Sequence, residues 1–154
     1  MYRMNFSKYL TKISIGFLFL FFSFNYGFAG DSNGHIIITV TQIKIESGLL
    51  RISIFDSKDG FPNKYKRALK FINLKIESPE MKIILPDVPF GEYAIAILHD
   101  ENNNEKMDTN FLRMPKEGYG VSNNVRGTFG PPKFENAKFP VKQDSVFLLI
   151  EMAY

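Results

Sequence analysis

The residues best suited to chemistry lie in one short stretch, residues 100–108, where oxygen-bearing side chains recur at alternate positions. Hard cations such as Ca²⁺ take about six to eight oxygen ligands from carboxylates, amides and backbone carbonyls. A loop that offers an oxygen at every second residue can wrap around such an ion, so the sequence predicts a Ca²⁺ site here. The candidate ligands are the side chains of Asp100, Asn102, Asn104 and Asp108, and the backbone carbonyl of Lys106.

The same residues also form turns without any ion, because Asp and Asn side chains hydrogen-bond to their own backbone. The stretch lacks the bidentate Glu that closes an EF-hand, since Phe111 stands at that position. Glu117 is the next carboxylate along the chain, and Asp56 and Asp59 could add charge if their loop lies at the same end. We therefore expect weak binding, with a dissociation constant of about 10⁻⁴ to 10⁻³ M.

His99 stands directly before this stretch and raises a second hypothesis, a hydrolase that uses His99 with Asp100 or Glu117. A catalytic histidine needs a nucleophile or a second acid within reach. Ser122 is one candidate along the chain, but nothing in the sequence brings it to His99. The favoured alternative is a structural histidine, either facing outward at a strand end or hydrogen-bonded to the loop that follows it. The sequence therefore assigns no catalytic residue, and an enzyme is the less favoured interpretation.

The first 29 residues have the layout of a signal peptide. Three basic residues precede an apolar run over residues 13–24, and Gly27 and Ala29 place small residues before a cleavage site. The run is about 12 residues long, short of the roughly 20 that a membrane-spanning helix needs. We therefore expect cleavage after Ala29, no stable membrane span, and a periplasmic or secreted protein.

Charge and cysteine content exclude several classes of function. The signal segment carries three of the 19 basic residues and no acidic residue, so the rest of the chain has 16 of each sign. A neutral domain without a basic stripe argues against nucleic-acid binding. The absence of cysteine excludes disulfides, thiol chemistry and a lipoprotein anchor on cysteine.

Residues 30–154 read as a series of short β-strands separated by turn residues. The pattern predicts an all-β fold, a single antiparallel β-sandwich of about seven strands, with a parity change at Thr41–Gln42 that indicates a bulge or a crossing between sheets. A hairpin turn is expected at residues 46–48 and one or two helical turns at residues 62–69. The predicted core residues are Ile38, Ile52, Ile54, Ile83, Ile95, Ile97 and Leu148.

One long ordered loop, residues 100–136, interrupts this pattern. Loops of this length are usually functional or held in place by other groups. We expect its aromatic side chains to pack it against the sandwich, and the alternative is a stacking platform for a glycan or peptide. These side chains are Phe111, Tyr119, Phe129 and Phe134.

Six motifs, in order along the chain, resemble the domain of unknown function 2141 family of exported bacterial proteins. They are residues 55–61, 88–94, 99–104, 108–111, 115–124 and 129–132. The resemblance implies an immunoglobulin-like or prealbumin-like sandwich and transfers no activity. The family loop usually has glycine where this chain has Asn103 and Glu105. Glu adopts the left-handed backbone region poorly, which argues against a tight EF-hand-like site.

Two functional hypotheses follow. The first is an exported, non-enzymatic module that binds a protein or glycan at the cell envelope, with its loop ordered by Ca²⁺. The second is the hydrolase that uses His99. The sequence gives no indication of the oligomeric state.

Overall fold

The computed structural model describes residues 32–44, 47–127 and 130–154, so the expected signal peptide lies outside the described residues. This described part is mostly β, with eight strands in two sheets and three very short helices. The strands are β1 (Asn33–Thr41), β2 (Leu49–Phe55), β3 (Lys70–Lys75), β4 (Met81–Pro89), β5 (Gly91–Asp100), β6 (Tyr119–Val121), β7 (Phe139–Val141) and β8 (Ser145–Glu151). The helices are η1 (Tyr65–Arg67), η2 (Ser122–Asn124) and α1 (Phe134–Ala137).

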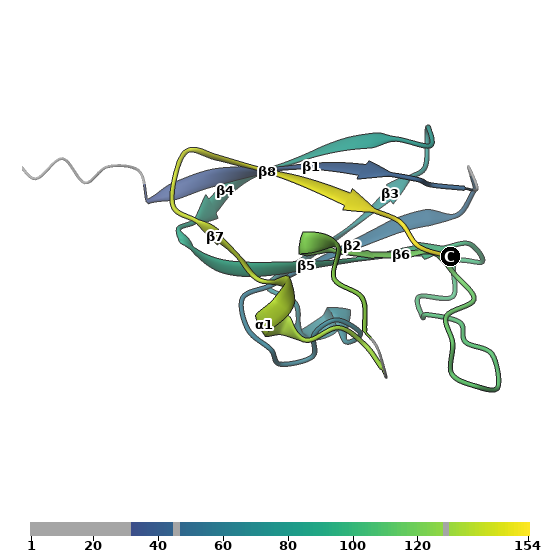
Figure 1. The fold of residues 1–154 in the computed structure, drawn as a ribbon. Helices are drawn as coiled ribbons and strands as arrows, with labels where there is room; N and C mark the ends of the chain where they lie inside the picture. The colour runs from purple at the N-terminus through teal and green to yellow at the C-terminus, as the bar shows by residue number, and fades with distance from the viewer. Residues whose placement is uncertain (1–31, 45–46, 128–129) are drawn as a thin grey trace, which may run out of the picture.

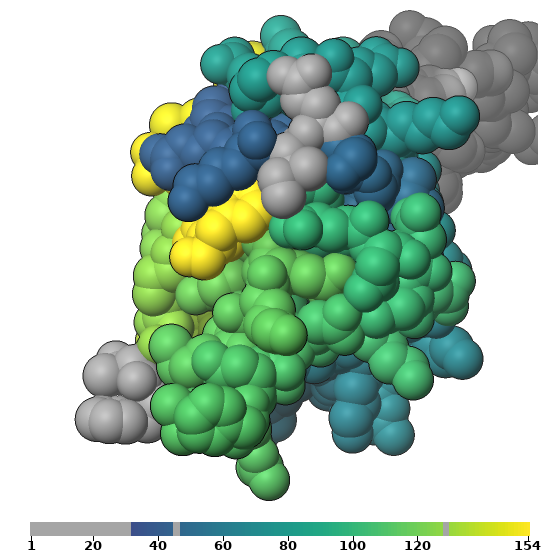
Figure 2. All heavy atoms as spheres, turned by 90° about the vertical axis from the view of Figure 1, so that its right-hand side faces the viewer, coloured from purple at the N-terminus to yellow at the C-terminus, as the bar shows by residue number. Residues whose placement is uncertain are grey.

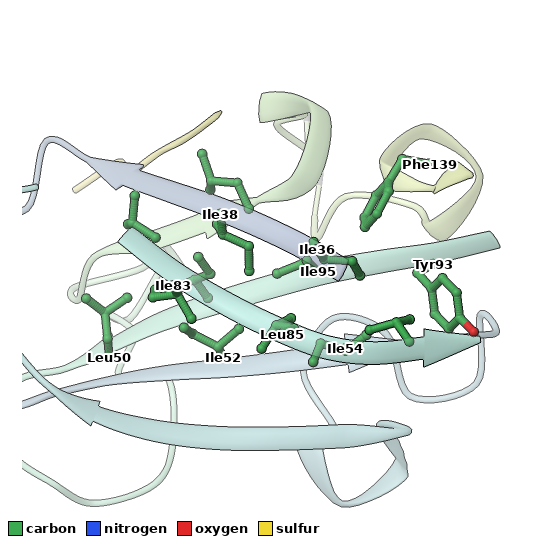
Figure 3. Close-up of a cluster of buried hydrophobic side chains, with 14 of the residues drawn as sticks. Ile36, Ile38, Leu50, Ile52, Ile54, Ile83, Leu85, Tyr93, Ile95 and Phe139 are labelled. Atoms are coloured by element: carbon green, nitrogen blue, oxygen red, sulfur yellow. The ribbon is translucent and has the colours of Figure 1, made fainter. Parts of the chain in front are cut away.

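The two sheets face each other across one hydrophobic core (Figures 1 and 3). The three-stranded sheet has the order β4-β1-β8, and the five-stranded sheet has the order β3-β2-β5-β6 with β7 paired to β5. Alternate residues of each strand point into the core, as period-2 burial requires. Six of the seven predicted core residues are buried, and Leu148 is half-buried and packs against them.

The strand connections differ from the prediction in three ways. β1 and β2 lie in different sheets, so the hairpin expected at residues 46–48 was wrong. The parity change beside it is a crossing between sheets, where Gln42 adopts a φ of 62°. β8 pairs with β1 in parallel, so the sheets are not purely antiparallel, and there are eight strands rather than about seven.

The outer face of the five-stranded sheet is covered by its own chain. A second cluster joins Phe55 and Ala94 of the sheet to Phe134 of α1, with Phe61 packed against it. Figure 1 shows α1 and the β2–β3 connection lying against this side of the sheet.

The prediction of one continuous loop over residues 100–136 was wrong, because β6, η2 and α1 interrupt it. What remains is the segment between β5 and β6, residues 101–118, called the long loop below.

Candidate functional site

The long loop projects from the end of the sandwich at which the C-terminus lies (Figure 1). In Figure 2, which looks at this end, its green atoms form a protrusion on the lower part of the molecule. The two ends of the loop meet where the N–H of His99 donates to the carbonyl of Gly118 at 2.8 Å. Two buried carboxylates, Asp100 and Glu117, lie at this base.

Asp100 holds the first half of the loop. Its side chain is fully buried, and its two oxygens accept hydrogen bonds from the backbone N–H groups of Asn104 at 3.0 Å and Glu105 at 2.9 Å. The Nε atom of Arg51 on β2 lies 2.6 Å from Oδ2 and forms an ion pair with it. Charge-assisted bonds of this kind are about twice as strong as neutral ones. The carboxylate predicted to bind a metal is therefore paired with a protein cation and with the loop backbone.

Glu117, near the end of the loop, bonds to two backbone groups nearer its start. Its Oε1 atom accepts from the N–H of Glu101 at 3.1 Å, and its Oε2 atom accepts from the N–H of Asp108 at 2.8 Å. One side chain thus ties two distant points of the loop together. The sequence suggested Glu117 only as a metal ligand or a catalytic acid and missed this anchoring role. No pattern of residue types in a sequence shows that a carboxylate will accept hydrogen bonds from backbone N–H groups.

Three of the predicted metal ligands do come together. The Nδ2 atoms of Asn102 and Asn104 donate to the carboxylate of Asp108, at 2.7 and 3.1 Å. The Oδ1 atoms of the two amides accept backbone N–H groups, that of Asn104 and that of Lys106. Within the described residues, no group of three or more His, Cys, Asp or Glu side chains could hold a metal ion. The side chains of Asn102, Asn104 and Asp108 are therefore hydrogen-bonded to one another and to the loop backbone.

The backbone is left-handed at Asn103 and Glu105, where the resemblance implies glycine. Asn103 has a φ of 60° and Glu105 has a φ of 67°. The Glu105 side chain reaches out of the loop to the hydroxyl of Tyr65 at 2.9 Å and to Arg51 at 3.3 Å. The Tyr65 hydrogen bond, with the positive charge of Arg51, lowers the pKa of Glu105. These contacts tie the loop to η1 and compensate for the unfavourable backbone.

His99 is buried and fully hydrogen-bonded. Its Nε2 atom lies 2.7 Å from the carbonyl of Ser47, which can only accept, so Nε2 carries the proton. Its Nδ1 atom lies 2.7 Å from the hydroxyl of Tyr154, which donates to it. Partial burial raises the pKa of Tyr154. The hydrolase hypothesis gains no support here, because both ring nitrogens are occupied by the protein.

The other residues considered for chemistry have structural partners. Ser122 is buried, where it accepts from the N–H of Ile95 at 2.9 Å and donates to the carbonyl of Ala137 at 2.7 Å. Asp59 pairs with Arg67 at the surface. In the part of the chain that the structure describes, no hydrogen bond or ion pair joins Asp56 or Asp59 to the long loop.

The end of the long loop, residues 109–116, is a small hairpin called the tip below. Thr109 and Pro115 form an antiparallel bridge across it. Asn110 organises the turn, because its Oδ1 atom accepts the N–H groups of Leu112 at 2.9 Å and Met114 at 3.0 Å. The tip is therefore ordered by its own hydrogen bonds and not by packing on the sheets.

The tip exposes three large apolar side chains. Phe111 is 93% exposed, Leu112 67% and Met114 58%. The prediction that Phe111 packs the loop against the sandwich was wrong. Of the other aromatic residues, Phe134 is buried in the second cluster and Tyr119 packs against that cluster, while Phe129 lies outside the described residues.

The amino-acid sequence matches a known protein family. A family model described as an uncharacterized protein conserved in bacteria (DUF2141) matches residues 38–147. The chain belongs to this family. The match includes the whole long loop and its tip, and the family carries no known activity. No curated protein and no solved structure matches the chain. In the described residues, no helix is long and apolar enough to cross a membrane.

Proposed function

We propose that the protein is an exported, non-enzymatic module that binds a component of the cell envelope through the tip of its long loop. The single observation behind this proposal is the exposure of Phe111, Leu112 and Met114 on a hairpin with a fixed backbone. Exposed apolar clusters mark interaction sites. A surface that is already ordered loses little conformational entropy when it binds.

The proposal includes several expectations from the sequence. Cleavage after Ala29 would release residues 30–154 into the periplasm or the medium, and a protein or glycan of the envelope is the expected partner. The immunoglobulin-like or prealbumin-like class of sandwich is part of the same proposal. It is supported by the two facing sheets.

A weak Ca²⁺ site in the long loop also belongs to the proposal. Asn102, Asn104 and Asp108 meet on one exposed side of the loop, with the amide nitrogens facing the Asp108 carboxylate, so binding would require the two amides to turn their oxygens toward the ion. The guanidinium of Arg51 on Asp100 works against tight binding, because a bound cation would be repelled by it. We therefore propose a low affinity, in the range of about 10⁻⁴ to 10⁻³ M.

Co-sedimentation with washed cell envelopes tests the binding function. The chain from Gly30 onward is suitable, because both hydrophobic clusters are formed by residues between Ile36 and Met152. We expect this chain to sediment with envelopes and the double variant Phe111→Ser/Met114→Ser to stay in solution. Phe147→Ser/Leu149→Ser is the matched control, since Phe147 is 71% and Leu149 53% exposed on β8, outside the long loop. Equal sedimentation of the wild type and the tip variant contradicts the proposal.

A further inference from the structure

We propose that the tip inserts its apolar side chains into the surface of a bilayer that contains anionic lipids. This inference rests on the proposed function, because it names the envelope component that the same tip contacts. It concerns peripheral binding at the lipid surface, through a loop, and requires no membrane-spanning segment.

The apolar part of the tip has the chemistry of an interfacial anchor. Phe111, Leu112 and Met114 are large, strongly exposed and close together at the end of one hairpin. Proteins that lie on a membrane bury such side chains at the boundary between head groups and acyl chains, and their affinity grows with the apolar area that is buried. The hairpin backbone satisfies much of its own hydrogen bonding, through the contacts of Asn110, which favours entry into a medium poor in water.

The charge of the tip selects the kind of bilayer. Between Thr109 and Lys116 the chain has two cations, Arg113 and Lys116, and no acidic residue. Both cations are exposed; Arg113 stands between Leu112 and Met114, and Lys116 follows Met114 by two residues. Basic residues near an anionic membrane strengthen binding by attraction to the negative head groups. Long basic side chains can also extend to the head groups while their neighbours enter the apolar layer.

The acidic residues of the long loop lie outside its tip, and most of them have partners elsewhere in the protein. Asp100 is paired with Arg51, and Glu105 contacts Arg51 and Tyr65. Glu117 is buried and accepts two backbone N–H groups. Asp108 accepts the amides of Asn102 and Asn104. The acidic residues of the loop, Glu101 included, all lie outside residues 109–116, so the charge within the tip itself is positive.

A glycan fits this surface less well. Sugar hydroxyls need hydrogen-bonding side chains beside an aromatic ring, and the side-chain carbonyl of Asn110 is already used by the N–H groups of Leu112 and Met114. A protein with an apolar pocket remains the competing partner, and the experiment separates it from lipid.

The experiment uses a fluorescent reporter at the tip. The chain has no tryptophan, so Phe111→Trp introduces a unique one, and Phe147→Trp is the matched control on β8. Residues 30–154 carrying either variant are mixed with protein-free vesicles of phosphatidylcholine alone, or of phosphatidylcholine with phosphatidylglycerol. We expect a blue shift and quenching by brominated acyl chains for Trp at position 111 with the anionic vesicles, and neither effect at position 147.

Vesicle flotation gives the energetic test. Phe111→Ser/Met114→Ser should weaken binding to anionic vesicles by about tenfold or more, since the apolar area drives insertion. Arg113→Gln/Lys116→Gln should remove most of the preference for anionic over neutral vesicles, and added salt should do the same. Far-UV circular dichroism checks that both variants keep the fold.

Failure of this inference is distinct from failure of the proposed function. If the wild type does not bind protein-free anionic vesicles, the lipid inference is overturned. If the same protein still sediments with whole envelopes through its tip, the binding function stands, and the partner is a protein or a glycan. Binding to vesicles that is unchanged in the Phe111→Ser/Met114→Ser variant also overturns the inference, because some other surface must then carry it.

Discussion

Replacing Asp100 by alanine should destabilise the protein far more than the loss of one surface charge would. The Asp100 side chain is fully buried, and the side chain of its partner Arg51 is 11% exposed. Removing one member of a buried pair costs about 3–5 kcal/mol, because the remaining charge stays in a poorly solvated place. Arg51 keeps a weaker contact to Glu105 at 3.3 Å, which places the expected loss near the lower end, about 3 kcal/mol.

Thermal and urea unfolding of the chain from Gly30 measure this loss. A change of about 3 kcal/mol should lower the melting temperature by roughly 10 °C in a domain of this size. The matched control is Asp59→Ala, which removes an exposed carboxylate paired with Arg67 and should cost about 0.5 kcal/mol or less. Both variants remove one aspartate from an ion pair, so the difference between their losses in unfolding free energy reports the effect of burial.

A double-mutant cycle with Arg51→Ala refines the test. If the pair acts as described, the double variant should lose clearly less than the sum of the two single variants. The backbone N–H groups of Asn104 and Glu105 should exchange faster with solvent in Asp100→Ala, since they lose their acceptor. A loss below about 0.5 kcal/mol for Asp100→Ala, with unchanged exchange, would refute this account of how the loop is held.

Three further predictions concern the core, the metal and the loop contacts. Ile97→Ala should cost about 2–5 kcal/mol in urea unfolding, because Ile97 is buried between the sheets, and a loss below about 0.5 kcal/mol contradicts that. Ca²⁺ at ten times its dissociation constant should add about 1.4 kcal/mol, a rise of a few degrees in melting temperature over chelator. Asp108→Asn should abolish that rise and Asp56→Asn should keep it, and an unchanged wild-type melt excludes the site. Because its folded-state pKa is lowered, Glu105 should contribute stability above its unfolded pKa, and this is lost as the pH falls through the folded pKa. Tyr65→Phe should raise the pKa of Glu105 in an NMR titration, and an unaltered titration contradicts the hydrogen bond.

Burial of the strands was predictable because it is a local property. Side chains alternate between the two faces of any strand, so Ile52, Ile54, Ile95 and Ile97 had to share a face with other apolar residues. Pairing between strands is not local. The segment around Ser47 has the composition of a hairpin turn, yet β1 and β2 enter different sheets, because each finds its partners elsewhere in the chain.

The same distinction explains the outcome at the candidate site. Asn102, Asn104 and Asp108 meet because amide and carboxylate groups a few residues apart can bond within one turn. The ion pair of Asp100 joins residues 49 positions apart in the sequence. It depends on the β2–β5 register, in which Arg51 lies opposite Leu98, two residues before Asp100. An arginine on the outer face of a strand was the available signal, but only the register makes it a partner.

The exposure of Phe111 was missed for a related reason. An aromatic residue in a long loop usually packs on the nearest sheet, and that expectation depends on the loop folding back. Here the bridge between Thr109 and Pro115 closes a separate hairpin, and the bonds of Asn110 fix its direction. The turn residues of the tip were visible in the sequence, and their effect on the direction of Phe111 was not.

The construction of the long loop itself argues that its tip has a use. In the described chain, no residue from 101 to 118 belongs to either hydrophobic cluster, so the loop adds nothing to the core. Two carboxylates, Asp100 and Glu117, are nevertheless buried beneath it, and burial of a charged group is unfavourable unless it is fully hydrogen-bonded. Most of their hydrogen bonds go to backbone N–H groups of the loop. A plain connection between β5 and β6 would need neither carboxylate. Both are explained if the loop must hold Phe111, Leu112 and Met114 at a fixed position in front of a binding surface.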